Sequence, residues 1–473
     1  MILWTNGTFY TMEDDKTHYN QILTNKGRVI ALGDDSLNFK YDKIIDLKGT
    51  FVYPGFTDGH MHLIGYGRKL NSINLNRNNN KADVLNIINN YFNNKTLKIE
   101  GYVDLNITKD ELDKISNKEY IILRHNDYHS FTVNSKVLTD LNIISNNGII
   151  KDEVIAKKIV SLWEDSSKDV LKEYLIDAIK ELYKNGITNV HTDDLSYFNS
   201  YNETLEIMLE VLDEYPFRIN TLIHYDVYDQ YLKGYPSNKY LKDIQVKLFY
   251  DGTISSKTAY LSENYKEDNH KGSRIINNLD EILKKIQSYN NSAAIHVIGD
   301  EALKEVVNIL NNNLNDTMPH RIVHASLSSL ETIENIKNHS IDIQPLFIES
   351  DKDVISKNID HDVLIYPFKK YIDENILVNS SSDAPVESVN IFDNIRELMK
   401  LGISNYNIVK TYTVNPSLTI NDNGGYIKVG RNADFTAFDK DLFTISIDTI
   451  KDVNITYTIV DENVVYHKKR KSW

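Results

Sequence analysis

PGFTDGHMHL, residues 54–63, decides the fold, because it places two histidines at the end of a short apolar run. His60 and His62 are two positions apart, so on an extended strand their imidazoles point to the same face. Two such imidazoles at the carboxyl end of a strand can share one divalent ion. Asp58 lies on the same face and is a candidate to orient a ligand. A lone His-x-His pair also fits chance or surface placement, but the position at a strand end favours a metal site.

Three further strand ends carry residues that can bind a metal. AAIHVIGDEA places His296 at the close of an apolar run, RIVHASL places His324 in the equivalent position, and ILVNSSSDAP places Asp383 just beyond another strand. Each one alone is compatible with a buried core histidine or with an aspartate that caps a helix. Because the catalytic groups of parallel barrels gather at the carboxyl ends of the strands, the shared location predicts one metal-binding rim.

A lysine interrupts the apolar strand in QVKLFYDGT, residues 245–253. An unpaired ammonium is costly to bury, so Lys247 needs a partner or a modification. One explanation is a salt bridge to Asp251. Another is carboxylation by carbon dioxide, which converts the amine into an anionic carbamate able to bridge two metal ions. The sequence leaves both explanations open.

The middle of the chain alternates apolar runs with helical stretches, which is typical of a parallel α/β barrel. Eight runs are present, the number that a closed (β/α)8 TIM barrel requires. Residues 120–124 are assigned to an insertion. Residues 57–186, which separate the first two predicted strands, are too many for one barrel helix and its loops. The predicted strands are Phe51–Phe56, Ile187–His191, Arg218–His224, Gln245–Tyr250, Ala293–His296, Arg321–His324, Ile341–Gln344 and Ile376–Ser380.

The sequence pattern at both ends of the chain is typical of short strands joined by tight turns. We therefore predict a small β-sandwich domain built from residues 1–52 and 419–473. The TIM-barrel catalytic domain then covers residues 53–418. It carries an insertion after its first strand, at about residues 66–160.

Composition narrows the function classes. The chain of 473 residues has a formal net charge of −14, which disfavours nucleic-acid and anionic-membrane partners. It contains no cysteine, which excludes disulfides, thiolate zinc sites and cysteine nucleophiles. A metal must then be held by nitrogen and oxygen ligands, which zinc, iron and manganese all accept. We find no secretory signal and no apolar run long enough to span a bilayer, so we expect a cytoplasmic protein.

Taken together, these motifs resemble those of a known group of enzymes. The chain resembles the amidohydrolase superfamily, and within it the YtcJ-like branch (amidohydrolase 3), which includes N-substituted formamide deformylases. The resemblance extends over nearly the whole chain. In order, its motifs are PGFTDGHMH (54–62), IILRHNDYHSFTVNSKVL (121–138), VKLFYDGTISSKTAYL (246–261), AIHVIGDEAL (294–303), RIVHASL (321–327), DIQPLF (342–347), SSDAP (381–385), YTVNPS (412–417) and GYIKVGRNADF (425–435).

The resemblance implies a centre of two divalent metal ions, with zinc favoured and iron or manganese as alternatives. Each ion is held by one pair of histidines, a carboxylated lysine bridges both ions, and an aspartate contacts the first ion and the attacking water. The implied ligands are His60 and His62 for the first ion, His296 and His324 for the second, Lys247 for both, and Asp383. If the lysine is unmodified, a single ion would be held by His60, His62, His296 and Asp383.

The resemblance also implies that the insertion covers the substrate, with His129 and Asn134 close to it. Lys257 stands where arginine is common in the family and is a further candidate for substrate binding. Lysine keeps the charge but loses the bidentate recognition of a carboxylate. Asp152 stands near a position where glutamate is usual. These departures affect the expected substrate more than the reaction class.

The expected function is metal-dependent hydrolysis of a carbon–nitrogen bond in a small, non-peptide amide, formamide or cyclic amide. Asp383 would take a proton from the attacking water and pass it to the leaving nitrogen. A homodimer is expected from the family alone. Two alternatives are a catalytically inactive barrel that binds a small molecule, and a metal-free barrel glycosidase with paired carboxylates. The complete ligand set disfavours the first alternative, and the second leaves the histidines unexplained.

Overall fold

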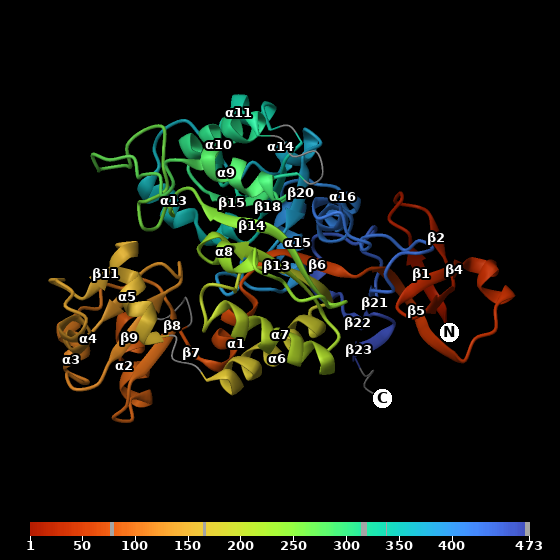
Figure 1. The fold of residues 1–473 in the computed structure, drawn as a ribbon, viewed down its shortest axis with the longest axis horizontal. Coiled ribbons are helices and arrows are strands. Elements are labelled where there is room, and N and C mark those ends of the chain that lie inside the picture. Colours follow the sequence, from red (N-terminus) through yellow and green to blue (C-terminus); the bar gives the residue numbers. More distant parts are fainter. Residues whose placement is uncertain (76–79, 164–166, 314–318, 337, 469–473) are drawn as a thin grey trace.

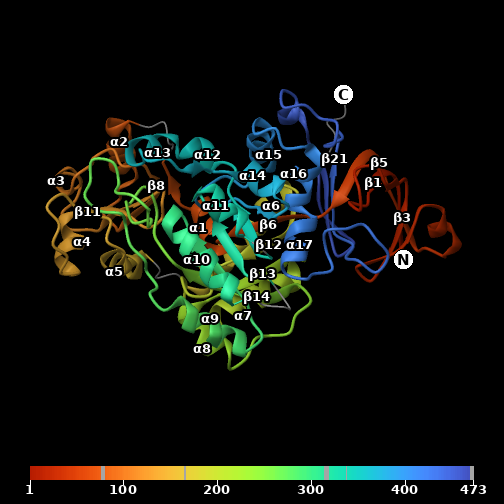
Figure 2. The ribbon, with the colours of Figure 1, turned by 90° about the horizontal axis from the view of Figure 1, so that it is seen from above.

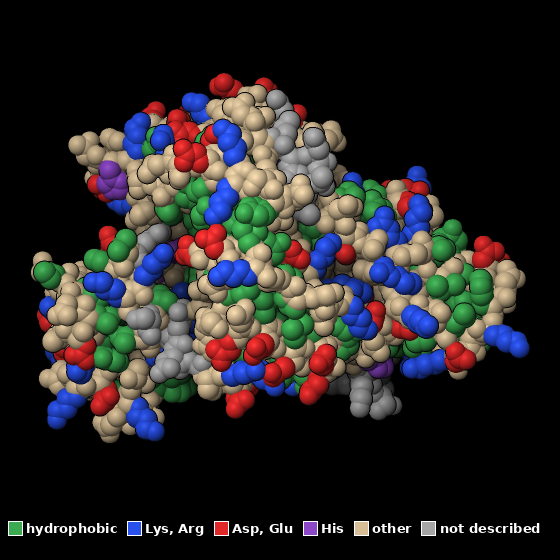
Figure 3. All heavy atoms as spheres, viewed as in Figure 1, with side chains coloured by type: hydrophobic (Ala, Val, Ile, Leu, Met, Phe, Trp, Pro, Cys, Tyr) green, Lys and Arg blue, Asp and Glu red, His purple; other side chains and the backbone are tan. Residues whose placement is uncertain are grey.

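The computed structural model describes residues 1–75, 80–163, 167–313, 319–336 and 338–468. Its three parts follow one another along the longest axis of the molecule (Figure 1). An inserted α/β unit lies at one end, the barrel lies in the middle, and a β domain lies at the other end. Acidic and basic side chains are interspersed over the face shown in Figure 3. None of the described helices is both long and apolar enough to cross a membrane.

The barrel is a parallel sheet of eight strands, which confirms the predicted architecture. The first and last strands meet through the loop after β20, where the amide of Asp383 donates to the carbonyl of His60 at 2.9 Å. This loop therefore holds both ends of the sheet together at the carboxyl rim. The strand order is β6 (Phe56–Met61), β12 (Ile187–Thr192), β13 (Arg218–His224), β14 (Leu241–Phe249), β15 (Ala293–Val297), β16 (Arg321–His324), β18 (Ser340–Ile343) and β20 (Leu377–Ser380).

Helices cover the outside of the barrel (Figure 2). In α6 the buried Leu171, Leu175 and Leu182 recur at the spacing of one helical face. The Ser167 side chain caps this helix by accepting from the amide of Val170. The helices of the barrel part are α1 (Leu63–Asn71), α6 (Lys168–Lys184), α7 (Tyr201–Glu214), α8 (Tyr228–Tyr231), α9 (Leu279–Ser288), α10 (Asp300–Asn312), α11 (Leu330–Glu334), α12 (Phe347–Ser350), α13 (Lys352–Asn358), α14 (Phe368–Asp373), α15 (Ile391–Lys400), α16 (Asn405–Tyr412) and α17 (Val414–Thr419).

The predicted first barrel strand, residues 51–56, is wrong in its position. Residues 51–54 belong to β5 (Lys43–Pro54) of the β domain, and the barrel begins with β6. The chain passes from one sheet to the other at Gly55, where a Cβ atom would lie 2.1 Å from the Thr188 hydroxyl oxygen. The apolar run marks β5 because its side chains pack in and against the β domain. The barrel strand itself carries the buried polar side chains of the site, which a hydrophobic pattern does not reveal.

Strands from both termini form the β domain, as predicted. β5 lies at its centre, because it pairs with β1 in parallel and with β21 in antiparallel orientation. Trp4 and Phe9 pack edge-on against Phe435, with ring centres 6.2 and 6.3 Å apart, so the domain has a core of its own. Its strands are β1 (Ile2–Tyr10), β2 (His18–Tyr19), β3 (Ile22–Asn25), β4 (Arg28–Leu32), β5, β21 (Phe435–Phe438), β22 (Ile455–Val460) and β23 (Asn463–His467).

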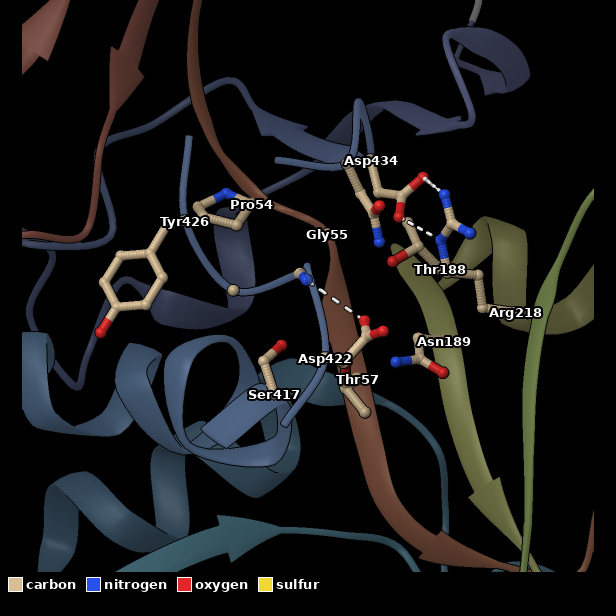
Figure 4. Close-up of a pocket in the computed structure, with 13 residues that line it drawn as sticks. Pro54, Gly55, Thr57, Thr188, Asn189, Arg218, Ser417, Asp422, Tyr426 and Asp434 are labelled. Carbon is tan, nitrogen blue, oxygen red and sulfur yellow. Dashed lines mark hydrogen bonds and ion pairs between the residues drawn. The ribbon is translucent and has the colours of Figure 1, made fainter. Parts of the chain in front are cut away.

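A small polar pocket lies where the amino ends of the barrel strands meet the β domain (Figure 4). Arg218, at the start of β13, forms a two-pronged ion pair with Asp434 of the β domain, in which Nη2 lies 3.0 Å from Oδ1. The side chains are only 13% and 8% exposed. This pair is the main charged link across the junction in the pocket.

Replacing Arg218 with methionine is expected to destabilise the protein by about 3 kcal/mol, because the carboxylate of Asp434 would stay buried without its cation. Urea denaturation followed by circular dichroism measures the change. Lys239→Met is the matched control, since Lys239 pairs with Asp461 at the same junction but is 66% exposed. Its loss should cost about 0–1 kcal/mol. Equal losses in both variants would contradict a structural role for the Arg218 pair.

The insertion has a sheet of its own, in the order β11-β10-β9-β8-β7, and packs against the carboxyl side of the barrel. Glu100 is fully buried and pairs with Arg68 of α1 at 2.8 Å, which ties the insertion to the barrel. The hydroxyl of Tyr128 donates to the same carboxylate at 3.1 Å. The elements are β7 (Ile73–Asn74), α2 (Lys81–Tyr91), β8 (Leu97–Tyr102), α3 (Lys109–Asp113), β9 (Ile121–His125), β10 (Phe131–Val133), α4 (Ser135–Asp140), β11 (Ile149–Ile150) and α5 (Glu153–Trp163).

Candidate metal centre

The carboxyl ends of β6 and β20 bring three side chains together. Nε2 of His60 lies 3.5 Å from Oδ1 of Asp383, and Nε2 of His62 lies 3.8 Å from the same oxygen. One ligand atom from each residue lies within 4.8 Å of the other two. Nδ1 of His60 is buried and has no hydrogen-bond partner among the described residues. This set of nitrogen and oxygen donors fits a divalent metal ion.

Lys247 lies beside this cluster. It is on β14, is 1% exposed, and its Nζ lies 3.0 Å from Nε2 of His60. The ring centre of Phe249 lies 4.8 Å from the same nitrogen. The salt bridge to Asp251, one of the two explanations for a buried lysine, is not formed. That carboxylate instead accepts hydrogen bonds from the amides of Tyr260, Ile298 and Gly299.

His296 and His324 stand on the next strands, with their ring centres 4.6 Å apart. The ring of His324 also lies 6.0 Å from that of His60. Nδ1 of His324 donates to Oε1 of Gln344 at 2.8 Å, and Nε2 of His296 donates to the carbonyl of Gly252 at 3.2 Å. Each bond fixes the tautomer, so that the other ring nitrogen carries the lone pair. Metal-binding histidines are commonly oriented in this way.

Asp58 holds the two halves of the cluster together. Its Oδ1 accepts from the amides of His60 and Ser382 at 3.2 and 3.1 Å, and its Oδ2 accepts from the Ser382 hydroxyl at 2.5 Å, so these hydrogen bonds go to the backbone and to a serine and not to an imidazole. It thereby ties β6 to the loop that carries Asp383. Nδ1 of His62 donates to a carbonyl after β12 at 2.7 Å, which leaves Nε2 facing Asp383.

Burial lowers the pKa of all four histidines, because an imidazolium loses its hydration in the interior. The pKa falls to about 4 at His62 and about 3 at His324, and well below its usual range at His60 and His296. Burial also lowers the pKa of the Lys247 amine. The imidazoles are therefore neutral near pH 7 and can donate lone pairs to a metal.

Two of these residues have a backbone that L-amino acids rarely adopt. His324 has a φ of 78° and Asp383 a φ of 53°. Such conformations persist only where surrounding contacts impose them, and they cluster at functional sites. The backbone thus supports the assignment of both strand ends to the site.

The three predicted substrate-binding residues have different surroundings. His129, on the insertion, is near enough to His62 and His324 to contribute to the lowered pKa of both imidazoles. Asn134 caps α4, and its amide donates to two carbonyls within the insertion. Lys257 pairs with Asp268 at 2.8 Å in the loop after β14. His129 thus remains a candidate near the metal cluster, while the hydrogen bonds of Asn134 lie within the insertion and the ion pair of Lys257 lies in the loop after β14.

Sequence reasoning missed the residues that follow β12. Asp193 is fully buried, and its Oδ2 accepts from the hydroxyl of Tyr197 at 3.0 Å. The ring of Tyr197 lies 5.4 Å from that of His62 and 5.5 Å from that of His224, so it forms a wall of the site. Two aspartates directly after a barrel strand, Asp193 and Asp194, were the signal in the sequence.

A buried charged network lies inside the barrel, below the metal cluster. Nη1 of Arg321 donates to the carbonyl of Gly59 and to Nδ1 of His191, both at 3.0 Å. The same nitrogen lies 3.3 Å from a carboxylate oxygen of Asp342. His191, although it is near a strand end, therefore belongs to this network. Through Gly59 the network supports the backbone that carries His60.

Comparison with known proteins gives a consistent result. The profile of the Amidohydrolase family matches residues 43–466. The chain is 26% identical to the protein YtcJ of Bacillus subtilis (strain 168), over 98% of this chain and 99% of that protein. It is 23% identical to Protein LONG AFTER FAR-RED 3 of Arabidopsis thaliana, over 84% of this chain and 78% of that protein.

Solved structures have the same fold. Structures described as uncharacterized metal-dependent hydrolases from Pyrococcus horikoshii OT3 and Pyrococcus furiosus give TM-scores of 0.80 and 0.76 at 22% and 23% identity. Each alignment covers 94% of this chain, and 99% and 100% of the other chain. The zinc complex of atrazine chlorohydrolase TrzN from Arthrobacter aurescens TC1 gives a TM-score of 0.60 at 13% identity, over 98% of this chain and 95% of that one. These similarities confirm the barrel fold.

Proposed function

Because the chain belongs to the Amidohydrolase family, we propose that it is a metal-dependent hydrolase that cleaves a carbon–nitrogen bond in a small, non-peptide amide. One observation carries this proposal: His60, His62 and Asp383 place their ligand atoms within 4.8 Å of one another at the carboxyl rim of the barrel. Formamides, N-acyl amines and cyclic amides are the proposed substrate types.

We propose two divalent ions as cofactors, with zinc first and iron or manganese as alternatives. His60 and His62 would hold one ion, and His296 and His324 the other, with a carboxylated Lys247 between them. The buried neutral imidazoles match the nitrogen preference of these metals. Bound there, such ions supply an acidified water and polarise the carbonyl of the substrate. With an unmodified lysine the centre would hold one ion.

Asp383 moves the proton in the proposed reaction. It stands at the rim, beside His60 and His62, where an attacking water would be held. As the water oxygen joins the carbonyl carbon, Asp383 accepts a proton from the water. As the carbon–nitrogen bond breaks, Asp383 returns that proton to the leaving nitrogen. The products are a carboxylic acid and an amine, so the step balances without another reactant.

Metal removal tests this proposal. Dialysis against a chelator is expected to abolish hydrolysis of a panel of formamides, N-acyl amines and cyclic amides, and added zinc, iron or manganese should restore it. Mass spectrometry of the metal content should find two ions per chain. One ion per chain would reject the bridging carbamate. A metal-loaded protein that binds but hydrolyses none of the panel would favour the inactive binding barrel.

A further inference from the structure

One carboxylate at the barrel mouth has no part in the proposed metal chemistry. Asp193 directly follows β12 and is 0% exposed. Its amide donates to the carbonyl of Met61 at 3.1 Å, and its carbonyl accepts from Nδ1 of His62 at 2.7 Å. Its backbone therefore lies against the strand end that carries the candidate metal ligands.

The two carboxylate oxygens of Asp193 differ in their contacts. Oδ2 accepts from the hydroxyl of Tyr197 at 3.0 Å. Oδ1 is equally buried, yet it has no hydrogen-bond partner among the described residues. A buried acceptor without a donor is costly and uncommon in folded proteins. A donor from outside the chain would remove this cost.

The carboxylate of Asp193 lies near the candidate metal ligands. Among the charges that raise the pKa of the Lys247 amine, Asp193 acts most strongly, ahead of Asp383. Its charge also raises the pKa of His62. The ring of Tyr197, its hydrogen-bond donor, stands edge-on to His62. Through Tyr197 the carboxylate is thus connected to the wall of the site beside His62.

The neighbouring Asp194 serves as a comparison, because the hydrogen bonds of its carboxylate are structural. It is also fully buried, but its two oxygens accept from the amides of Leu63 and Ile64 at 2.9 and 3.2 Å. The hydroxyl of Thr192 donates to it as well. Asp194 therefore holds the start of α1 and has no oxygen left for a ligand. The hydrogen bonds of the two carboxylates therefore distinguish Asp193 from Asp194, although the two aspartates are adjacent in the chain.

We propose that Asp193 determines substrate specificity, because its open oxygen accepts a hydrogen bond from an N–H group of the substrate beside the carbonyl that is hydrolysed. This inference rests on the proposed function and narrows its substrate class to primary and secondary amides. N,N-disubstituted amides, whose nitrogen carries no hydrogen, would leave the oxygen unpaired. The amine product, which is protonated near pH 7, would donate to the same oxygen.

Matched compounds test the inference on the full-length, metal-loaded protein. N-benzylformamide has the N–H group, and N-benzyl-N-methylformamide lacks it. The wild type should prefer the first by about 10-fold to 100-fold in kcat/KM, and Asp193→Asn should bring the ratio close to one. Titration calorimetry with benzylamine, the amine product, should show a Kd at least about 10-fold weaker in Asp193→Asn.

Two further variants and the metal content make the result decisive. Asp194→Asn is the matched control and should keep the wild-type ratio. Tyr197→Phe should also keep it, because both oxygens of Asp193 remain acceptors. An unchanged ratio and unchanged benzylamine affinity in Asp193→Asn would overturn the inference, as would loss of metal from that variant. If the wild type hydrolyses no compound of the amide panel, the proposed function fails; if it hydrolyses amides but Asp193→Asn changes neither the ratio nor the benzylamine affinity, only the inference fails.

Discussion

His60→Ala/His62→Ala is expected to lose the metal ion of the first position and the hydrolytic activity together. The two imidazoles at the end of β6 are the nitrogen ligands proposed for that ion, and Asp383 with Lys247 is not expected to hold a divalent ion there without them. Activity on the best substrate of the amide panel should fall by roughly 10³-fold or more, because both water activation and carbonyl polarisation depend on the metal. Metal analysis of the purified variant and steady-state kinetics measure the two losses side by side.

His18→Ala/His270→Ala is the control for this experiment, since it removes two exposed histidines that are not among the candidate ligands. It should retain the metal content and the rate of the wild type. Circular dichroism of both double variants checks that the fold survives. If the His60/His62 variant kept its metal and most of its activity, the site would have been placed on the wrong strands.

Much of the fold follows from the sequence, because strand ends and apolar runs carry strong patterns. The eight barrel strands, the insertion around β9 and the joint β domain were all predicted from such patterns. The first strand was misplaced, because residues 51–54 are more apolar than the barrel strand that follows Gly55. A strand whose buried face is polar has no hydrophobic signature. In the sequence, such a strand is recognised only by the candidate metal ligands that it carries.

The site was predictable only in part. The strand-end histidines and Asp383 stand out in the sequence because histidine and aspartate are uncommon at the ends of buried strands. Asp193 does not stand out, since its role depends on one oxygen that the fold leaves without a donor. Asn134 shows the reverse case. A motif cannot distinguish an asparagine that binds substrate from one that caps a helix, and here the amide caps α4.

Asp383→Asn is expected to keep metal bound and still lose most of the activity. Asparagine has the same shape and tolerates the φ of 53° found at Asp383, whereas alanine would strain the loop. The histidine ligands remain, so most of the metal should be retained. Without a group that accepts and returns the proton, kcat should fall by roughly 10² to 10⁴, with a smaller change in KM.

Asp280→Asn serves as the control for this substitution, because Asp280 is a partly exposed residue that pairs with Lys284 on α9. The kinetics should be followed together with metal content, since the two roles assigned to Asp383 predict different results. Loss of metal in step with kcat would make it chiefly a ligand. Retained metal with a fallen kcat would make it the proton carrier. A variant with full metal and near wild-type kcat would reject both roles, and the proton would then have to pass through another group at the rim.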